Sequence, residues 1–324
     1  MKKNRFSEEQ IVSILWAASY LGSNPFQLSL RDKEGVRFLV DKLQKADLSS
    51  FYFTLRALLH RNRWLLRTSQ GMKGVLFYGP LRNLFIRYFQ QFHKRKPIER
   101  ISSNLFSTLD VGKTVHEISE NGYSIGEKLP DEYIHEILQF CEIERRIKYW
   151  NPHRECQAID QVCRNEKILE VAKRYLGVEP ILWVTELKWS IGSSMEKGNF
   201  IPSAHQEPVQ YDQYGFHYDM LDFKSLTVFI YLTDVDVDAG PHVIVSGTHK
   251  KKSLWDLFNI ILSDQKAFQK YGDRVKTILG KKGTVFFEET HNYHKVSPCK
   301  TKRLLLKIDY VLQRKSPPPR PIMS

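Results

Sequence analysis

The sequence predicts an α+β fold in which helices come first and antiparallel strands, arranged as a sandwich or barrel, follow. Two patterns carry this prediction. Apolar residues recur at helical spacing up to about residue 176, and short β-forming runs separated by turns dominate after residue 181. The 324 residues, 42% of them hydrophobic and 12% aromatic, are enough to bury a sizeable core.

The chain divides by composition into three regions. Residues 1–105 are predicted to form a helical N-terminal region, within which 81–92 has a clear helical pattern. The basic run His-Lys-Arg-Lys-Pro at 93–97 is interpreted as a solvated helix end and linker. A second domain is predicted over 106–315, and the Pro-rich segment 316–324 reads as a tail.

The second domain opens with helices and continues with strands. Ile134, Ile137 and Cys141 lie on one helical face after a Leu-Pro-Asp-Glu start, and Gly177 ends a later helix. Beyond it, β-branched and aromatic residues gather in short runs. The predicted elements are a strand at 123–125, helices from 129 and over 159–176, and strands over 181–189, 216–220, 226–233, 243–245, 283–287 and 304–312.

Charge and cysteine content narrow the class of protein. The net charge of +13 favours an anionic partner or substrate, but no recognised nucleic-acid motif accompanies it, which argues against nucleic acid. Four cysteines without a CxxC pair predict reduced thiols and a cytoplasmic location. The chain has no apolar run of 18 residues, so no transmembrane helix is predicted.

The most informative stretch is Gly-Phe-His-Tyr-Asp at 215–219. Side chains alternate along a β-strand, so His217 and Asp219 are expected to point to the same side. An imidazole and a carboxylate on one side provide two ligands of a metal. A second histidine would complete the 2-His-1-carboxylate triad, which leaves positions open on a non-haem Fe(II).

The third ligand must come from later in the chain. His242 and His249 lie in a turn-rich region and are expected to be structural or solvent-facing. His291 and His294 are three residues apart, so in an extended strand only one of them can point inward.

Arg303 favours His294 as the third ligand. A hairpin centred on Pro298-Cys299 is expected to place His294 opposite Arg303. A guanidinium beside a metal-bound histidine is suited to grip a carboxylate in bidentate fashion, as 2-oxoglutarate requires.

These residues together resemble the phytanoyl-CoA dioxygenase family of Fe(II)/2-oxoglutarate-dependent oxygenases. The likeness covers about 115–312 and rests on five segments. They are Gly-Phe-His-Tyr-Asp at 215–219, Phe-Ile-Tyr-Leu-Thr-Asp-Val at 229–235, Ala-Gly-Pro at 239–241 with Ser-Gly-Thr-His at 246–249, Glu-Thr-His-Asn-Tyr-His at 289–294, and Arg-Leu-Leu at 303–305.

The resemblance implies a double-stranded β-helix (jelly-roll, cupin-like) core with flanking helices. It assigns His217, Asp219 and His294 to Fe(II) and Arg303 to the cosubstrate 2-oxoglutarate, and it suggests that Tyr231 lines the cosubstrate pocket. The implied activity is hydroxylation or another oxidation of a small molecule by O2, with release of succinate and CO2. Halogenating relatives replace the carboxylate ligand with a small residue, so retention of Asp219 favours hydroxylation.

Two departures from the family pattern, and several alternatives, stay open. Glu289 and His291-Asn292 stand where relatives usually carry Asp and Gly, which keeps His291 as an alternative ligand or a support for one. The N-terminal 105 residues match nothing in the pattern. A zinc-dependent hydrolase or isomerase, a non-catalytic binding protein, and a nucleic-acid oxygenase are the rival functions.

The substrate is not specified by these motifs. The positive net charge favours an anionic substrate or one tethered to an acidic carrier or coenzyme A. Segments 190–215 and 250–280 are expected to contact it, and the polar stretch 192–210 has the composition of a lid.

Overall fold

The computed structural model describes residues 81–92, 95–191, 215–250, 252–253, 256–257 and 261–313. Residues 82–251 and 261–324 form one compact unit, and the account below concerns its described part. The predicted lid, the tail and the predicted N-terminal helices before residue 81 lie outside the described residues. The predicted division at residue 105 stays a prediction.

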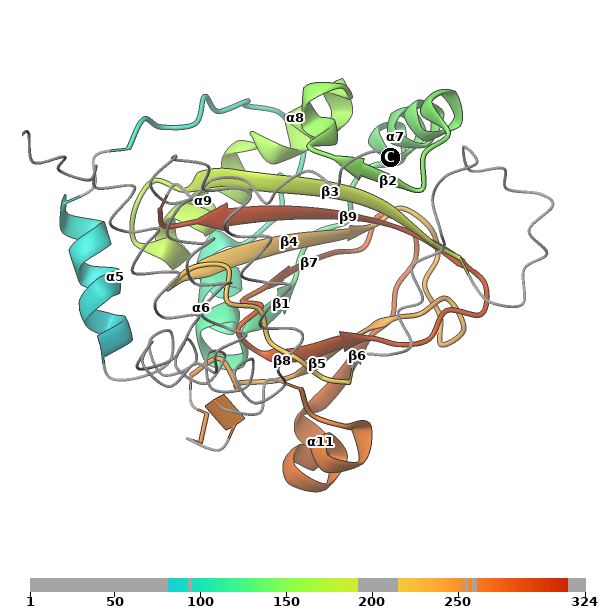
Figure 1. Cartoon of the computed structure of the whole chain (residues 1–324). Coiled ribbons are helices and arrows are strands. Elements are labelled where there is room, and N and C mark those ends of the chain that lie inside the picture. Colours follow the sequence, from blue (N-terminus) through green and yellow to red (C-terminus); the bar gives the residue numbers. More distant parts are fainter. Residues whose placement is uncertain are drawn as a thin grey trace, which may run out of the picture. The chain divides into compact units, whose positions relative to one another are not determined.

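Helices make up most of the first half of the described chain (Figure 1). They are α5 (Leu81–Phe92), α6 (Val111–Asn121), α7 (Asp131–Glu144), α8 (Gln157–Cys163), α9 (Glu166–Leu176) and, later in the chain, α11 (Asp264–Tyr271), with 3-10 turns η2 (Pro152–Arg154) and η4 (Gly272–Arg274). The helical pattern over 81–92 and the helix opening at Pro130 are confirmed. No helix in the described part is long and apolar enough to cross a bilayer.

The single helix predicted over 159–176 is wrong, because the chain breaks it at Asn165. The fully buried Asn165 side chain accepts hydrogen bonds from the backbone N–H groups of Lys167 and Ile168, which caps α9. Its amide also donates to the carbonyl of Leu105. A capping residue needs non-helical backbone, so α8 and α9 are separate helices.

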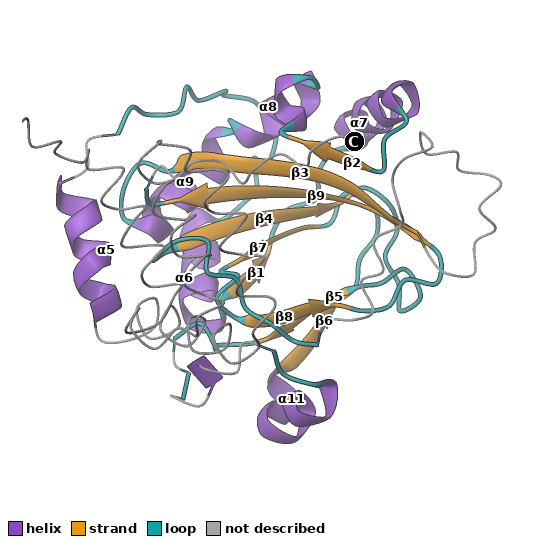
Figure 2. Cartoon of the chain, viewed as in Figure 1, coloured by secondary structure: helices purple, strands orange, loops and turns teal. Residues whose placement is uncertain are grey.

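The strands form two antiparallel sheets, shown in orange in Figure 2. The six-stranded sheet has the order β1-β7-β4-β9-β3-β2, and the three-stranded sheet has the order β6-β5-β8. The strands are β1 (Tyr123–Ile125), β2 (Lys148–Trp150), β3 (Ile181–Ile191), β4 (Ser225–Tyr231), β5 (His242–Val245), β6 (Val275–Ile278), β7 (Val285–Glu288), β8 (Tyr293–Val296) and β9 (Lys302–Val311). From β3 onward the chain passes back and forth between the two sheets.

Strand alternation gives the six-stranded sheet two different faces. On the outer face, Tyr310 of β9 donates a hydrogen bond of 2.6 Å to the Cys163 carbonyl at the end of α8. On the inner face, Phe229 and Phe286 pack with Ile244 of the other sheet in one apolar cluster. Helices therefore cover the outer face, while the inner face and the three-stranded sheet enclose a common interior.

Two strand predictions need correction. A continuous strand over 216–220 is replaced by single bridges, Phe216 with Leu262 and His217 with His294. Strand pairing does not extend beyond His217, because the segment before His294 forms a turn in which the N–H of Asn292 donates to the carbonyl of Glu289.

The predicted hairpin between His294 and Arg303 is also wrong. β8 pairs with β5 in the three-stranded sheet, whereas β9 pairs with β3 and β4 in the other sheet. Residues 297–301 carry the chain from one sheet to the other, and the cross-strand partner of Arg303 is Ser190.

Candidate metal centre and anion site

Three of the predicted site residues converge at the edge of the three-stranded sheet. One ligand atom from each of His217, Asp219 and His294 lies within 4.8 Å of the others. Backbone pairing brings them together, since His217 and His294 exchange hydrogen bonds of 2.9 and 2.7 Å and the N–H of Asp219 bonds to the Thr290 carbonyl. Two imidazoles and a carboxylate at this separation fit one divalent transition metal and leave further positions open.

The charge states of these groups suit a metal. Burial lowers the pKa of His294 to about 4, so its ring is neutral near pH 7. Burial raises the pKa of Asp219, but nearby His294 and Lys307 outweigh that effect and hold the pKa below its usual value. A neutral imidazole and an ionised carboxylate are the forms that bind a metal ion.

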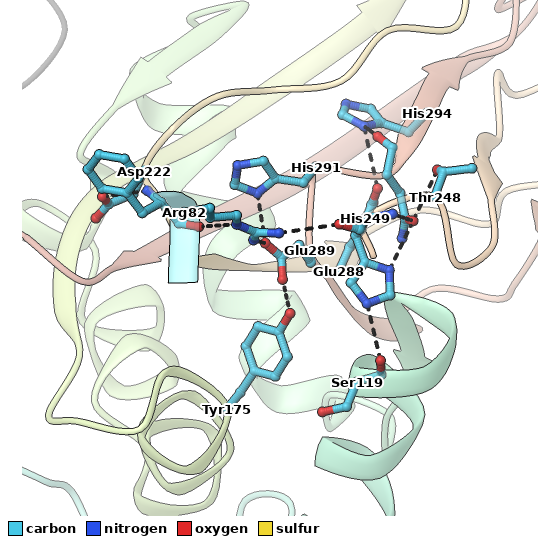
Figure 3. A network of polar contacts seen from close by, with 12 residues as sticks. Arg82, Ser119, Tyr175, Asp222, Thr248, His249, Glu288, Glu289, His291 and His294 are labelled. Atoms are coloured by element: carbon cyan, nitrogen blue, oxygen red, sulfur yellow. Dashed lines mark hydrogen bonds and ion pairs between the residues drawn. The ribbon is translucent and has the colours of Figure 1, made fainter. Parts of the chain in front are cut away.

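His291, the alternative ligand, is engaged elsewhere. Its Nδ1 lies 2.7 Å from Oε1 of Glu289, a buried carboxylate that also forms an ion pair of 2.7 Å with Arg82 and accepts a hydrogen bond from the hydroxyl of Tyr175 (Figure 3). This network ties α5 and α9 to the segment that precedes His294. His291 is absent from the convergent group of possible ligands.

Glu288 and His242 are site residues that sequence reasoning missed. Oε2 of Glu288 lies 2.7 Å from Nε2 of His242, and Oε1 lies 3.5 Å from Nδ1 of His294. Burial raises the pKa of Glu288 to about 7 and lowers that of His242 to about 3. His242 is buried in β5, so of the two roles predicted for it, structural or solvent-facing, the second is wrong. The sequence offered one signal for Glu288, which is an acidic residue on the same face as Phe286 in an otherwise apolar strand.

Arg303 is a buried cation with no acidic partner among the described residues. Its Nη1 donates to the Gly240 carbonyl and its Nη2 donates to Oγ of Ser190 at 3.2 Å, but its Nε has no hydrogen-bond partner among the described residues. Burial lowers its pKa, and the groups that act against burial are Tyr231 and Cys299 rather than a carboxylate. Gly240 has φ 70°, a conformation that glycine adopts without strain. The guanidinium therefore fits an anion with one or more carboxylate oxygens.

Tyr231 connects the two sheets close to Arg303. From β4, its hydroxyl donates to the Ile278 carbonyl at 2.9 Å and accepts from the N–H of His242 at 3.1 Å. Both partners belong to the three-stranded sheet. The hydroxyl is thus already used by two backbone groups, and the ring belongs to the apolar cluster between the sheets.

Further charges lie on the inner face of the six-stranded sheet. Lys307 on β9 lies 3.3 Å from Asp309, which accepts a hydrogen bond of 2.7 Å from Thr227. Burial lowers the pKa of Lys307, but Asp309 and other carboxylates outweigh it and raise the pKa. On β3, burial lowers the pKa of Lys188 to about 8, against an opposing effect of Glu186.

Comparisons with known proteins give the following. No family model matches the chain, and no curated protein matches it. Similar solved structures include the non-heme alpha-ketoglutarate-dependent epimerase SnoN from nogalamycin biosynthesis, with 15% identity and a TM-score of 0.44 over 62% of this chain and 82% of that chain. EctD from S. alaskensis with bound Fe has 12% identity and a TM-score of 0.48 over 63% and 79%. AviO1 from Streptomyces viridochromogenes Tue57 has 15% identity and a TM-score of 0.44 over 66% and 99%. The family resemblance predicted from the sequence stays a prediction.

Proposed function

We propose that the protein is an Fe(II)- and 2-oxoglutarate-dependent oxygenase. The observation that carries this proposal is that a group of possible metal ligands and a buried guanidinium share the interior between the two sheets. His217, Asp219 and His294 converge as a candidate metal-binding triad, and Arg303 is a buried guanidinium that meets no acidic side chain in the described part of the chain. A metal chelated by a dicarboxylate satisfies both, because one end of the molecule binds the metal and the other binds Arg303.

The strand order supports a double-stranded β-helix. Strands β3, β9, β4 and β7 stand side by side in the six-stranded sheet, and the His217 bridge, β8, β5 and β6 follow one another in the second sheet. Successive chain segments therefore alternate between the two sheets, except for β5 and β6, which are neighbours in the three-stranded sheet. In this arrangement the candidate metal ligands lie on the side of the three-stranded sheet, and Arg303 lies on the facing six-stranded sheet.

The residues have separate tasks in this proposal. Bound Fe(II) with 2-oxoglutarate supplies the oxidation of a substrate carbon by O2, with succinate and CO2 as coproducts. His217, Asp219 and His294 hold the metal on one side and leave the opposite side for cosubstrate and O2. Arg303 orients the cosubstrate through its distal carboxylate, and buried aromatic residues such as Phe229 exclude water.

The finer features of the reaction are also proposals. Asp219 occupies the carboxylate position, which supports hydroxylation rather than halogenation. The excess of positive charge supports an anionic small molecule, free or tethered to a carrier. Tyr231 is proposed to line the cosubstrate site through its ring, since its hydroxyl is bonded to backbone.

An anaerobic titration tests the proposal. Fe(II) and 2-oxoglutarate added together should give a weak visible metal-to-ligand charge-transfer band that neither gives alone. Asp219→Ala and His294→Ala should abolish the band, Arg303→Met should weaken it, and His291→Ala is the matched control that keeps it. Zinc binding without any response to 2-oxoglutarate would instead support the hydrolase or isomerase alternative.

A further inference from the structure

Glu288 is a buried carboxylate between two imidazoles, directly behind the metal triad. Its side chain is fully buried on the inner face of β7, with His242 at 2.7 Å on one side and His294 at 3.5 Å on the other. Figure 3 shows Glu288 next to the His294 ring. The two imidazoles are the only basic side chains within 4 Å of its carboxylate among the described residues.

The fold brings this trio together from three strands. Glu288 lies opposite Thr227 in the six-stranded sheet, on the face that points to the interior. His294 pairs with Ile244 of β5, so His242, two residues earlier, is its diagonal neighbour on the same face. The two imidazoles stack with centroids 5.4 Å apart and an interplanar angle of 19°.

The acceptors around His294 fix which ring nitrogen carries the proton. Nδ1 faces two oxygens, the Asn292 carbonyl at 3.0 Å and Glu288 at 3.5 Å, whereas Nε2 faces Asp219 at 3.8 Å in the metal triad. A neutral ring between two acceptors at Nδ1 carries its hydrogen there. The Nε2 lone pair is then free to bind a metal, and a carboxylate behind Nδ1 strengthens that donation.

We infer that Glu288 is a positioning residue that holds His294 as an Nδ1–H tautomer, with His242 fixing Glu288 in turn. A carboxylate with a purely structural role would be expected to form hydrogen bonds to backbone N–H groups, lysine or arginine. Neither oxygen of Glu288 makes a hydrogen bond within the described chain, and the nearest basic nitrogens are those of the two imidazoles, at 2.7 Å in His242 and 3.5 Å in His294. The inference rests on the proposed metal site but not on the identity of the substrate.

The first test reads the tautomer in the metal-free protein. Long-range nitrogen-15 NMR of histidine side chains, with His294 assigned from His294→Asn, should show Nδ1–H in the native chain. Glu288→Ala should move His294 toward the Nε2–H form, and Glu288→Gln, whose amide oxygen still accepts, should restore most of the native pattern. Unchanged His294 signals in a folded Glu288→Ala protein would overturn the inference.

The second test reads metal affinity with Co(II) as the probe. Loss of a carboxylate behind a ligating histidine should weaken binding about 10- to 100-fold and alter the Co(II) absorption spectrum, with Glu288→Gln intermediate. Glu289→Gln is the matched control, because that neighbouring buried carboxylate contacts His291 and Arg82 rather than His294. Equal losses in Glu288→Gln and Glu289→Gln would mean a general packing effect and contradict the inference.

Failure of this inference differs from failure of the proposed function. If the native protein binds Co(II) but gives no charge-transfer band with Fe(II) and 2-oxoglutarate, the oxygenase proposal fails and the Glu288 inference stands. If the band forms and Glu288→Ala leaves Co(II) affinity unchanged, the inference fails alone. Should Glu288→Ala not fold, the Co(II) titration of Glu288→Gln still decides the outcome, because an affinity equal to that of the native chain would contradict the inference.

Discussion

The two sheets enclose one interior but present different chemistry to it. The three-stranded sheet offers His242 and His294, whose pKa values burial lowers to about 3 and about 4, so both rings are neutral near pH 7. The six-stranded sheet offers Arg303, Lys307 and Asp309, which are charged or ion-paired. Neutral imidazoles supply lone pairs to a metal, and the cationic side chains of the six-stranded sheet can hold the carboxylates of a ligand. Each sheet is suited to one half of a chelated dicarboxylate.

The largest expected effect comes from unpairing charges on the six-stranded sheet. Asp309→Ala removes the carboxylate 3.3 Å from Lys307 and the acceptor of Thr227. We expect the free energy of unfolding to fall by about 3 kcal/mol, because a buried ammonium loses its nearest counter-charge. Urea unfolding measures this loss. The double variant Lys307→Met/Asp309→Leu should recover most of it, and a loss below about 1 kcal/mol would mean that the pair is screened by water.

Replacing Arg303 sharpens the comparison further. Arg303→Met should raise the dissociation constant of 2-oxoglutarate about 30-fold, since a charge-assisted contact is lost. Binding of pyruvate, a 2-oxo acid without a distal carboxylate, should change little. The ligand-free variant should be at least as stable as the native chain, because the removed cation is buried and none of the described carboxylates pairs with it. Equal weakening for both acids would place Arg303 outside the cosubstrate site.

Sequence reasoning predicted three candidate ligands that the structure brings together, and most of the strands, but not the route of the chain between the sheets. His217, Asp219 and His294 follow from the His-x-Asp spacing and a distal histidine, and the structure brings them together. The argument for His294 from a hairpin with Arg303 was wrong, because a local turn rule cannot tell that the chain changes sheets at 297–301.

Other features of the site and of the fold depend on contacts between residues that are distant in the sequence. Glu288 and His242 are 46 positions apart in the sequence, and their contact depends on the packing of one sheet against the other. The break at Asn165 is likewise a tertiary effect, since that side chain is buried against Leu105. The short strand β1 was predicted from its β-forming residues, whereas β2 and β6 were not predicted although they carry β-forming residues as well.

Replacing Tyr231 tests whether its hydroxyl holds the two sheets together in the absence of ligand. Tyr231→Phe removes one hydroxyl that bonds to Ile278 and His242 across the interior. We expect a loss of about 1 to 2 kcal/mol in unfolding free energy, since a buried carbonyl and a buried N–H lose a partner. The affinity for 2-oxoglutarate should stay within about threefold, because both hydroxyl bonds are to backbone. Thermal unfolding and the anaerobic titration measure the two quantities, and a large loss of affinity alone would show that the hydroxyl contacts the cosubstrate.

The smallest effect concerns the pH dependence of the six-stranded sheet. Burial lowers the pKa of Lys188 to about 8, and among the described residues Glu186 on its own strand, Lys148 on β2 and Arg303 on β9 also act on it. Below that pH the ammonium is charged and favours a nearby dianion. We therefore expect the affinity for 2-oxoglutarate to fall about fivefold as the pH rises from about 7 to 9.

Two variants assign this pH dependence to Lys188. Lys188→Arg stays charged and should remove the fall in affinity, and Lys188→Met should be uniformly weaker with a flat profile. The stability of the ligand-free protein should change with the opposite sign. Because an unfolded lysine titrates near 10.5, the unfolded state binds more protons between pH 8 and 10.5, and the Lys188 contribution to stability rises over that range. A fall in affinity that persists in Lys188→Arg would assign the titration to another group of that sheet.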